Sequence, residues 1–460
     1  MDGFDREVLS RLPLAEAVWT LLRYVADEQL LTELFERHRG TGSEREVTFP
    51  LLVELVTDAL LQHAGSGRQS FQAAREAQRL SATNEAVYGK LRRLPLPLSE
   101  SFVRETTRRL RQVVPEGLAS DVPPALSQYR VLVVDGKKLK RLPKRLKALR
   151  QVRGKVLGGK VVAGLLLNEG LVIAMHASPD GEANDAPLVP QLMDQCQAEF
   201  VEPVLYVADR QFCDLTIPRR TEERGQWFLI RYSQKMLFSS EKERSFHDAQ
   251  GHLVREAWGW LGSAKDPRRM YVRQITLTRP EEEDVILITN LMDSDQVPGE
   301  QLLTAYLARW NIERVFQQVT EVFHLERLVS TSPQGAVFQF ALCVLLYNLI
   351  QVIRGYIASL QSRSSHSLSS EMIFRSTCDQ LTACAVLLPT QPLVAELAPL
   401  QSPVEVRQRL IHLLVDQWSS LWIKSPRKKK SPPKQQTAIR GGHSSAWKLI
   451  TAAKQKPPPR

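Results

Sequence analysis

The stretch PGEQLLTAYLARWNIERVFQQVTEVFH, residues 298–324, decides the fold. Apolar residues recur through its second half at helical spacing, which predicts one helix with a buried stripe. Pro298 suits the start, because proline is favoured in the first turn of a helix. Tyr306, Arg309 and Glu313 stand at i, i+3 and i+7, so on a continuous helix they fall within roughly 60° of one another, beside the stripe. The helix would present these three polar side chains together.

Arg309 and Glu313, taken alone, could form an ordinary surface ion pair worth a few tenths of a kcal/mol. Two further acids favour a functional interpretation. Asp135 follows the apolar run VLVV and Asp209 follows VLYVA, so each carboxylate is expected at the C-terminal end of a strand, where α/β sheets place their chemistry. Three converging carboxylates would repel one another without a cation. Such an all-oxygen site suits Mg²⁺ or Mn²⁺.

The composition indicates a soluble globular protein of roughly two to four domains, since 43% of the 460 residues are hydrophobic and 24% are charged. The net charge of +11 comes from residues 424–460, which hold eleven Lys or Arg and no acid. Residues 1–423 therefore balance, with 50 basic and 50 acidic residues. The basic segment indicates either a polyanionic partner or a solvated, disordered end.

Other patterns exclude several classes of protein. The five cysteines show no metal-ligand spacing and are expected to be reduced intracellular thiols. The first ten residues are acidic and lack the apolar stretch of a signal peptide. Residues 328–353 carry no charge and are long enough to span a bilayer. Gln339, Asn348 and Gln351 interrupt them, so a buried core helix is predicted and no membrane partner is expected.

Helical periodicity dominates the N-terminal part of the chain, with runs at 14–25, 50–62 and 102–114. Arg104, Arg108 and Arg111 share one face of the last run. That face would either contact phosphates or be merely exposed and basic.

From residue 129 onward, short apolar runs predict three consecutive strands, then a helix, a strand, a second helix and another strand. This order predicts an α/β fold with a mixed sheet. The expected domains are an N-terminal helical domain that could bind a DNA end, two parts of a catalytic core separated by a β-rich insertion, a C-terminal helical region and a basic disordered tail. The N-terminal helical domain is predicted at 1–124, the two parts of the core at 125–235 and 285–360, and the insertion at 236–284. The C-terminal helical region is predicted at 361–423 and the tail at 424–460. One short helix is expected within the tail at 444–455, formed on the chain itself or only on a partner.

Four motifs occur in order along the chain: VVDG with Asp135, YVADRQF with Asp209, ITNL, and YLARWNIE. This arrangement resembles the DDE transposases of bacterial insertion sequences, over roughly residues 125–355. In particular it resembles the insertion-sequence-four family, marked by the signature Tyr-x2-Arg-x3-Glu-x6-Lys. Tyr306, Arg309 and Glu313 match the first three signature positions, whereas Thr320 stands at the lysine position.

The resemblance implies a ribonuclease-H-like core in which Asp135, Asp209 and Glu313 are catalytic and bind two divalent ions, Mg²⁺ or Mn²⁺. The implied activity is cleavage of DNA at the end of an element and transfer of the freed 3′-hydroxyl into target DNA. Tyr306 and Arg309 would contact phosphates beside the cut. The family lysine is thought to contact the DNA backbone, so Thr320 places that contact and full activity in question.

Further DNA contacts are expected near these acids. Residues 137–160 contain eleven Lys or Arg and no acid, which predicts phosphate contacts by Lys137, Lys138 and Lys140, with a solvated basic face as the alternative. Arg210 could pair with an acid or a phosphate.

Two tryptophans of the insertion, Trp258 and Trp260, would either pack in a core or stack on an unstacked base. His176, at the end of a predicted strand, is expected to be structural rather than a metal ligand.

The implied partners are double-stranded DNA, as element ends and as target, and a second copy of the chain in the DNA complex. The expected location is the bacterial cytoplasm, at the nucleoid when DNA is bound. Two other functions compete with that of an active transposase. One is a transposase-derived DNA-binding protein without catalysis, which Thr320 favours, and the other is a hydrolytic nuclease on the same core.

Overall fold

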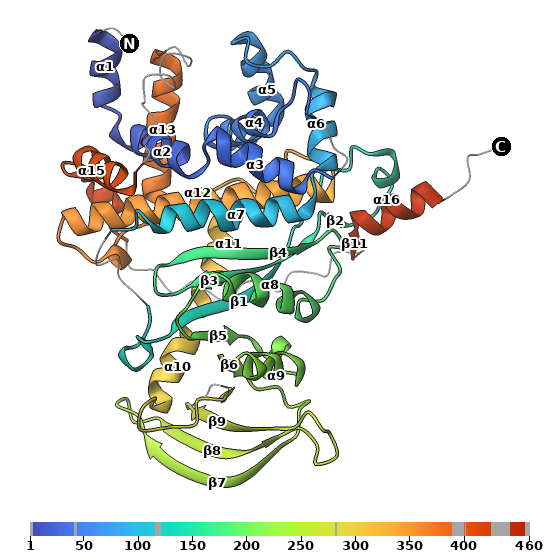
Figure 1. Ribbon diagram of the computed structural model, residues 1–460, viewed down its shortest axis with the longest axis vertical. Helices are drawn as coiled ribbons and strands as arrows, with labels where there is room; N and C mark the ends of the chain where they lie inside the picture. The colour runs from blue at the N-terminus through green and yellow to red at the C-terminus, as the bar shows by residue number, and fades with distance from the viewer. Residues whose placement is uncertain are drawn as a thin grey trace.

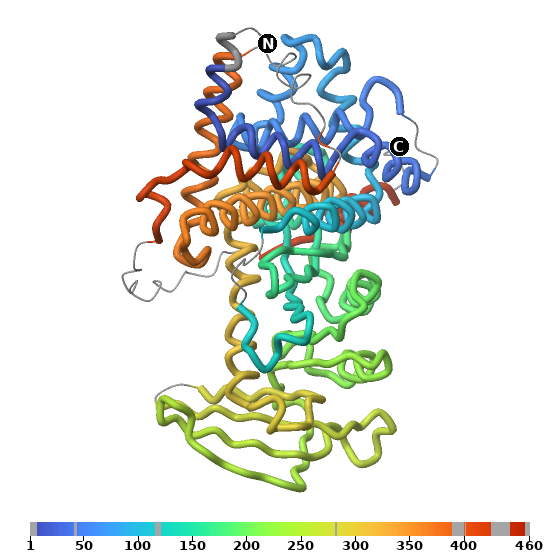
Figure 2. Tube along the Cα trace, turned by 60° about the vertical axis from the view of Figure 1, so that its left-hand side comes forward, coloured from blue at the N-terminus to red at the C-terminus, as the bar shows by residue number. Residues whose placement is uncertain are grey.

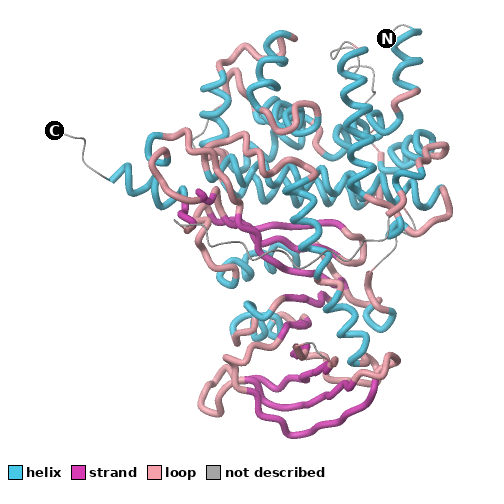
Figure 3. The backbone as a smooth tube through the Cα atoms, turned by 180° about the vertical axis from the view of Figure 1, so that it is seen from behind, coloured by secondary structure: helices cyan, strands magenta, loops and turns pink. Residues whose placement is uncertain are grey.

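The computed structural model describes residues 3–40, 44–115, 121–280, 283–388, 400, 402–424 and 442–455. A nine-stranded mixed sheet begins beside a block of helices and ends in the strands β9, β8 and β7 at the opposite end of the molecule (Figures 1 and 3). Its strand order is β4-β3-β1-β5-β6-β10-β9-β8-β7. The strands are β1 (Arg130–Lys138), β3 (Lys160–Leu166), β4 (Leu171–Ser178), β5 (Val204–Ala208), β6 (Trp227–Arg231), β7 (Phe238–His247), β8 (Leu253–Leu261), β9 (Met270–Thr278) and β10 (Val285–Thr289).

The first five of these strands make a ribonuclease-H-like sheet. β1, β3 and β4 are antiparallel neighbours, whereas β5 and β6 continue from β1 in parallel. Side chains alternate across β1 because a strand has a period of two. Val131 and Val133 pack in one core with the long helices, and Leu132 and Val134 pack on the other face with α8 (Val189–Gln197). The predicted α/β fold class is confirmed.

Strands β7, β8 and β9 form the predicted β-rich insertion. β10 pairs antiparallel with both β6 and β9. The insertion therefore extends the core sheet instead of forming a separate one.

The helical block contains the N-terminal helices and several from the C-terminal half (Figure 1). These are α1 (Gly3–Ser10), α2 (Pro13–Val25), α3 (Glu28–His38), α4 (Phe49–Leu61), α5 (Gly67–Glu76), α6 (Asn84–Arg93), α7 (Leu96–Arg111), α12 (Pro333–Leu360), α13 (Ser370–Leu387) and α15 (Pro403–Leu414). α7 begins earlier than predicted, because Pro95 caps it and Pro97 lies in its first turn.

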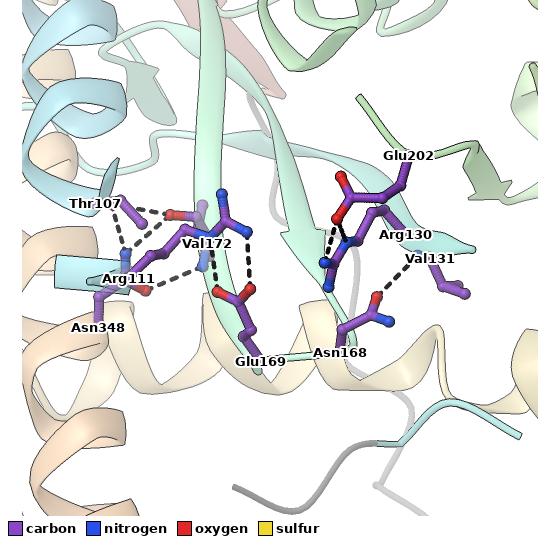
Figure 4. A network of polar contacts seen from close by, with 9 residues as sticks. All are labelled: Thr107, Arg111, Arg130, Val131, Asn168, Glu169, Val172, Glu202 and Asn348. Atoms are coloured by element: carbon purple, nitrogen blue, oxygen red, sulfur yellow. Dashed lines mark hydrogen bonds and ion pairs between the residues drawn. The ribbon is translucent and has the colours of Figure 1, made fainter. Parts of the chain in front are cut away.

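Helix α12 is the apolar segment that the sequence marked as long enough to cross a membrane. Its most apolar window has a mean hydropathy of 2.0 and is 100% buried in the protein. Asn348, one of the polar residues that interrupt it, donates to Thr107 Oγ1 and to the Val172 carbonyl (Figure 4). The prediction of a buried core helix is confirmed.

The arginine face of α7 is engaged within the protein. Arg111 donates to both carboxylate oxygens of Glu169, at 2.7 and 2.8 Å (Figure 4). Arg108 pairs with Glu105, and Arg104 Nε lies 3.9 Å from Glu199 Oε1. Arg104 and Arg111 are partly buried against these acids, whereas Arg108 remains exposed, as one of the two alternatives predicted. Contact of this face with phosphates stays a prediction.

The helix predicted at 298–324 is two helices, α10 (Gly299–Leu307) and α11 (Trp310–Glu321). At the bend, Arg309 N bonds to Tyr306 O at 3.0 Å and Ile312 N bonds to Arg309 O at 3.1 Å. These are i→i−3 bonds, which tighten the chain locally. The two helices run past the sheet from the helical block to the insertion (Figure 2).

The C-terminal segment returns to the core. β11 (His443–Ser445) pairs in parallel with β2 (Lys155–Leu157), and α16 (Ala446–Gln455) follows. The helix expected at 444–455 therefore forms on its own chain, not on a partner. The tail predicted to be disordered lies largely outside the described residues.

Candidate active site

The two aspartates lie on neighbouring parallel strands. Val134 of β1 is in register with Ala208 of β5, so the residues that follow, Asp135 and Asp209, occupy the same edge of the sheet. Each carboxylate accepts a hydrogen bond from the next backbone N–H, at 2.8 Å for Asp135 and 2.7 Å for Asp209. Asp209 directly follows its strand, as predicted. Asp135 lies within β1, which continues to Lys138 beside β3, and it follows only the part of β1 that pairs with β5.

The bend between α10 and α11 brings the other three predicted residues to the same edge. Tyr306 Oη donates to Asp209 Oδ1 at 3.3 Å. Arg309, which is only 4% exposed, places Nη1 2.9 Å from Glu313 Oε1 and 4.0 Å from Asp135 Oδ2. The helix pair therefore joins the two strand-borne acids through one tyrosine and one arginine.

The electrostatics of the site show that the acids influence one another. Burial raises the pKa of Asp135, and the negative charges of Glu313 and Asp209 raise it further. The hydrogen bond from the Gly136 N–H and the positive charge of Arg309 lower this pKa, but by less. Burial would lower the pKa of Arg309, yet Tyr306, Asp209 and Glu313 together raise it above its ordinary value. Arg309 is therefore firmly cationic in the centre of an acidic cluster.

The donor chemistry of this cluster fits a divalent cation. Three carboxylates surround one guanidinium, which leaves the group with two uncompensated negative charges if all are ionised, and hard cations prefer carboxylate oxygens. The described ranges contain no group of three or more acidic, His or Cys side chains already spaced to hold a metal ion. Arg309 stands between Asp135 and Glu313. Any ion would share the site with that arginine.

The basic residues after Asp135 differ in exposure. Lys138 and Lys140 are exposed. Lys137 is half-buried, and its Nζ donates to the Phe316 carbonyl at 3.4 Å. Thr320 Oγ1 donates to the same carbonyl at 2.6 Å. The Lys137 ammonium thus lies beside the position where the resemblance led us to expect a lysine.

Arg210 is exposed, and its Nη1 lies 3.7 Å from Glu283 Oε1. This exposed pair is one of the two alternatives predicted for Arg210. Its contact with a phosphate stays a prediction.

The two tryptophans are not open stacking platforms. Trp258 is 8% exposed and donates from Nε1 to the Met292 carbonyl at 3.1 Å. Trp260 donates to Glu241 Oε1 at 2.9 Å, and Arg269 covers its ring at 4.4 Å. The stacking role suggested for Trp258 is wrong, because a buried ring cannot receive a base. Trp260 is partly exposed, but Arg269 already occupies one face of its ring.

His176 contacts Glu100 Oε1 through Nδ1 at 3.1 Å, which agrees with a structural role. All five cysteines are free thiols, as expected.

Sequence reasoning missed three residues around the site. Gln211 Nε2 lies 3.5 Å from Asp135 Oδ1, and its place two residues after Asp209 could have suggested it. Asp185 packs against Gly136 and pairs with Lys160. No sequence signal links these two residues, because the pairing depends on how the loop before α8 returns to the sheet.

One family model matches the part of the chain that contains this site. Residues 126–349 match the family model described as a transposase DDE domain. Among solved structures, a cryo-EM structure of the piggyBac transposase synaptic complex with hairpin DNA is similar at 11% identity and a TM-score of 0.41, covering 84% of this chain and 86% of that one. The comparison with curated proteins found no match. Asp135, Asp209 and Glu313 all lie within the matched residues 126–349.

Proposed function

We propose that the chain is a transposase that binds the ends of an insertion sequence and catalyses cleavage and strand transfer of DNA. One observation carries the proposal. Asp135, Asp209 and Glu313, far apart in the sequence, are joined through Arg309 and Tyr306 at one edge of the DDE domain. An ordinary surface ion pair between Arg309 and Glu313 would not account for the two aspartates.

In this proposal Asp135, Asp209 and Glu313 would hold Mg²⁺ or Mn²⁺, which when bound would supply charge stabilisation for phosphoryl transfer. Arg309 and Tyr306 are each 4% exposed and hold the carboxylates in place. For either to bind a phosphate oxygen beside the reacting bond, the site would first have to open around it. The partly buried position of Asp135 limits access of bulk water to this edge. The domain division, a dimeric DNA complex and a nucleoid location belong to the same proposal.

A DNA-binding protein without catalysis is the second candidate, and Thr320 is the residue that favours it. The position of Lys137 weakens this alternative. Its ammonium contacts the carbonyl that Thr320 also contacts, so a cation is present there although residue 320 carries none.

The test is an assay of the purified chain with DNA from the ends of its element, in Mg²⁺ or Mn²⁺. We expect nicking at the end and joining to target DNA, both lost in Asp209→Asn. Glu326→Gln, a change of a surface acid just beyond α11, is the matched control and should leave both steps intact. Products that persist in Asp209→Asn would overturn the mechanism. Nicking without joining would favour a nuclease, and binding without nicking would favour the non-catalytic protein.

A further inference from the structure

A small polar cavity lies behind the helix that carries Glu313. Its volume is about 90 Å³, and its walls come from α11, α12 and the turn between β3 and β4. The α11 side chains that line it include Asn311, Arg314 and Gln318. At about 100° per residue, Asn311 and Gln318 lie about 140–160° around α11 from Glu313, and Arg314 lies about 100° from it. The cavity is therefore separate from the candidate active site.

Arg354 of α12 enters this cavity without a partner. Its Nε is buried and has no acceptor among the residues that the structure describes, while Arg354 as a whole is partly exposed. Burial lowers the pKa of Arg354, while Tyr347 and Asp121 raise it. An arginine nevertheless stays charged, and a buried charge without hydrogen bonds is strongly unfavourable.

A second donor stands one helical turn before Arg354. Gln351 is 2% exposed, lines the cavity, and has no acceptor for Nε2 in the described part of the chain. Residues three apart on a helix share a face, so the Gln351 amide and the Arg354 guanidinium point into the same space. Two adjacent buried donors without acceptors indicate a missing acceptor.

The acids that line the cavity are already engaged. Both oxygens of Glu169 accept from Arg111 (Figure 4). Asp121 accepts from Asn311 Nδ2 at 2.6 Å and lies 3.3 Å from His366 Nδ1. Arg314 and Lys424 add positive charge to the same wall. The cavity therefore offers donors and positive charge.

We propose that this cavity binds a phosphate-class oxyanion, held by the guanidinium of Arg354 and the side-chain amide of Gln351. Arginine pairs with phosphate oxygens through parallel charge-assisted hydrogen bonds. At about 10–15 Å³ of this volume per water, the cavity has room for several waters and so for one tetrahedral ion. A bound ion would stabilise the position of α11 through the α11 side chains that line the cavity. This inference does not depend on the proposed function.

The test compares thermal unfolding and calorimetric titration of the full chain in phosphate-free buffer. We expect inorganic phosphate to bind at one site per chain and to raise the unfolding midpoint saturably. Arg354→Met should weaken phosphate binding by at least about tenfold. Gln351→Glu supplies a carboxylate beside Arg354, so it should raise the midpoint without phosphate and abolish the response to phosphate. Arg375→Met, which changes an exposed arginine of α13, is the matched control and should respond as the parent does.

No response of the parent chain to phosphate, or an equal response in Gln351→Glu, would overturn the proposal and leave a water-filled cavity. The Gln351→Glu arm decides even if Arg354→Met fails to fold. Short oligonucleotides with and without a terminal phosphate then separate the sources of the ligand. Displacement of inorganic phosphate by the phosphorylated strand alone identifies a nucleic-acid phosphate, and displacement by neither identifies the free ion.

Discussion

Gly136 lies directly against the carboxylate of Asp185: a Cβ built on Gly136 would fall 2.3 Å from Asp185 Cγ. Asp185 cannot move away easily, because it is paired with Lys160 and both side chains are 6% exposed. Gly136 follows Asp135 in β1. This close approach therefore fixes the loop before α8 against the strand that carries a proposed catalytic residue.

Gly136→Ala is expected to destabilise the protein by about 1–3 kcal/mol, the usual cost of overpacking a rigid site, and to reduce DNA cleavage by moving Asp135. Urea unfolding and a cleavage assay measure the two effects. Gly89→Ala in α6 is the control, since its Cβ meets only the flexible end of Arg93. Equal stability and activity of both variants would show that the Gly136 contact is not rigid.

Replacement of Lys137, Lys138 and Lys140 by Ala should weaken DNA binding uniformly across sequences. If each lysine contacts one phosphate, the slope of log affinity against log salt should become shallower by about 2–3 units. Fluorescence anisotropy at several salt concentrations gives the slope. Arg375→Ala on α13 should leave it unchanged, and an unchanged slope in the triple variant would refute the phosphate contacts.

Thr320→Lys tests whether Lys137 supplies the charge absent at residue 320. Both side chains reach the Phe316 carbonyl, so we expect Thr320→Lys to restore about one unit of salt slope to Lys137→Ala. If Thr320→Lys leaves the salt slope of the Lys137→Ala variant unchanged, residues 137 and 320 do not contact the same phosphate.

Asp58 in α4 should make stability depend on pH. Burial and Glu54 raise the pKa of Asp58 to about 6, against the lowering effect of Arg79. The folded protein then binds more protons than the unfolded chain between about pH 4 and pH 6. The contribution of this carboxyl to stability therefore falls as pH rises through that window and stays low above it.

Asp58→Asn should consequently match the parent near pH 4 and exceed it at pH 7, by up to about 3 kcal/mol. Urea unfolding at the two pH values measures the difference. Glu54→Gln changes the more exposed acid beside Arg79 and should show a much smaller effect. A stability gain for Asp58→Asn that is the same at both pH values would exclude titration as the cause.

Arg273 and Glu256 form a buried ion pair at the junction between the insertion and α10. Both side chains are fully buried, and Arg273 Nη2 lies 2.6 Å from Glu256 Oε1. Glu256 also abuts Gly299, where α10 begins. Arg273→Met should destabilise the protein by less than the about 3–5 kcal/mol expected for a wholly unpaired buried carboxylate, because Glu256 Oε2 still accepts from Arg244 Nε at 2.8 Å. Adding Glu256→Leu should recover most of that loss in urea unfolding.

Arg268→Met in the exposed loop between β8 and β9 is the control for this pair, and it should have little effect. A double variant no more stable than Arg273→Met would contradict the account. It would then point to the Arg273 bonds with the Leu291 and Val297 carbonyls.

The sequence predicted the local elements well where they depend on nearby residues. The apolar runs around Asp135 and Asp209 are strands, and the face shared by Tyr306, Arg309 and Glu313 survives the bend at Arg309. That bend was not predictable, because no proline or glycine marks it. The pairs Gly136–Asp185 and Arg273–Glu256 were also not predicted from the sequence, because each joins two segments that are brought together by tertiary packing and not by their spacing along the chain.

The pairing of β11 with β2 has a consequence for biosynthesis. Lys155 and His443 are register partners, so the connection between β1 and β3 must wait for a segment made much later by the ribosome. Closing so long a loop is entropically slow. A nascent chain can thus assemble its nine-stranded sheet before β11 exists, and the two-stranded sheet of β2 and β11 forms only at a late stage of synthesis.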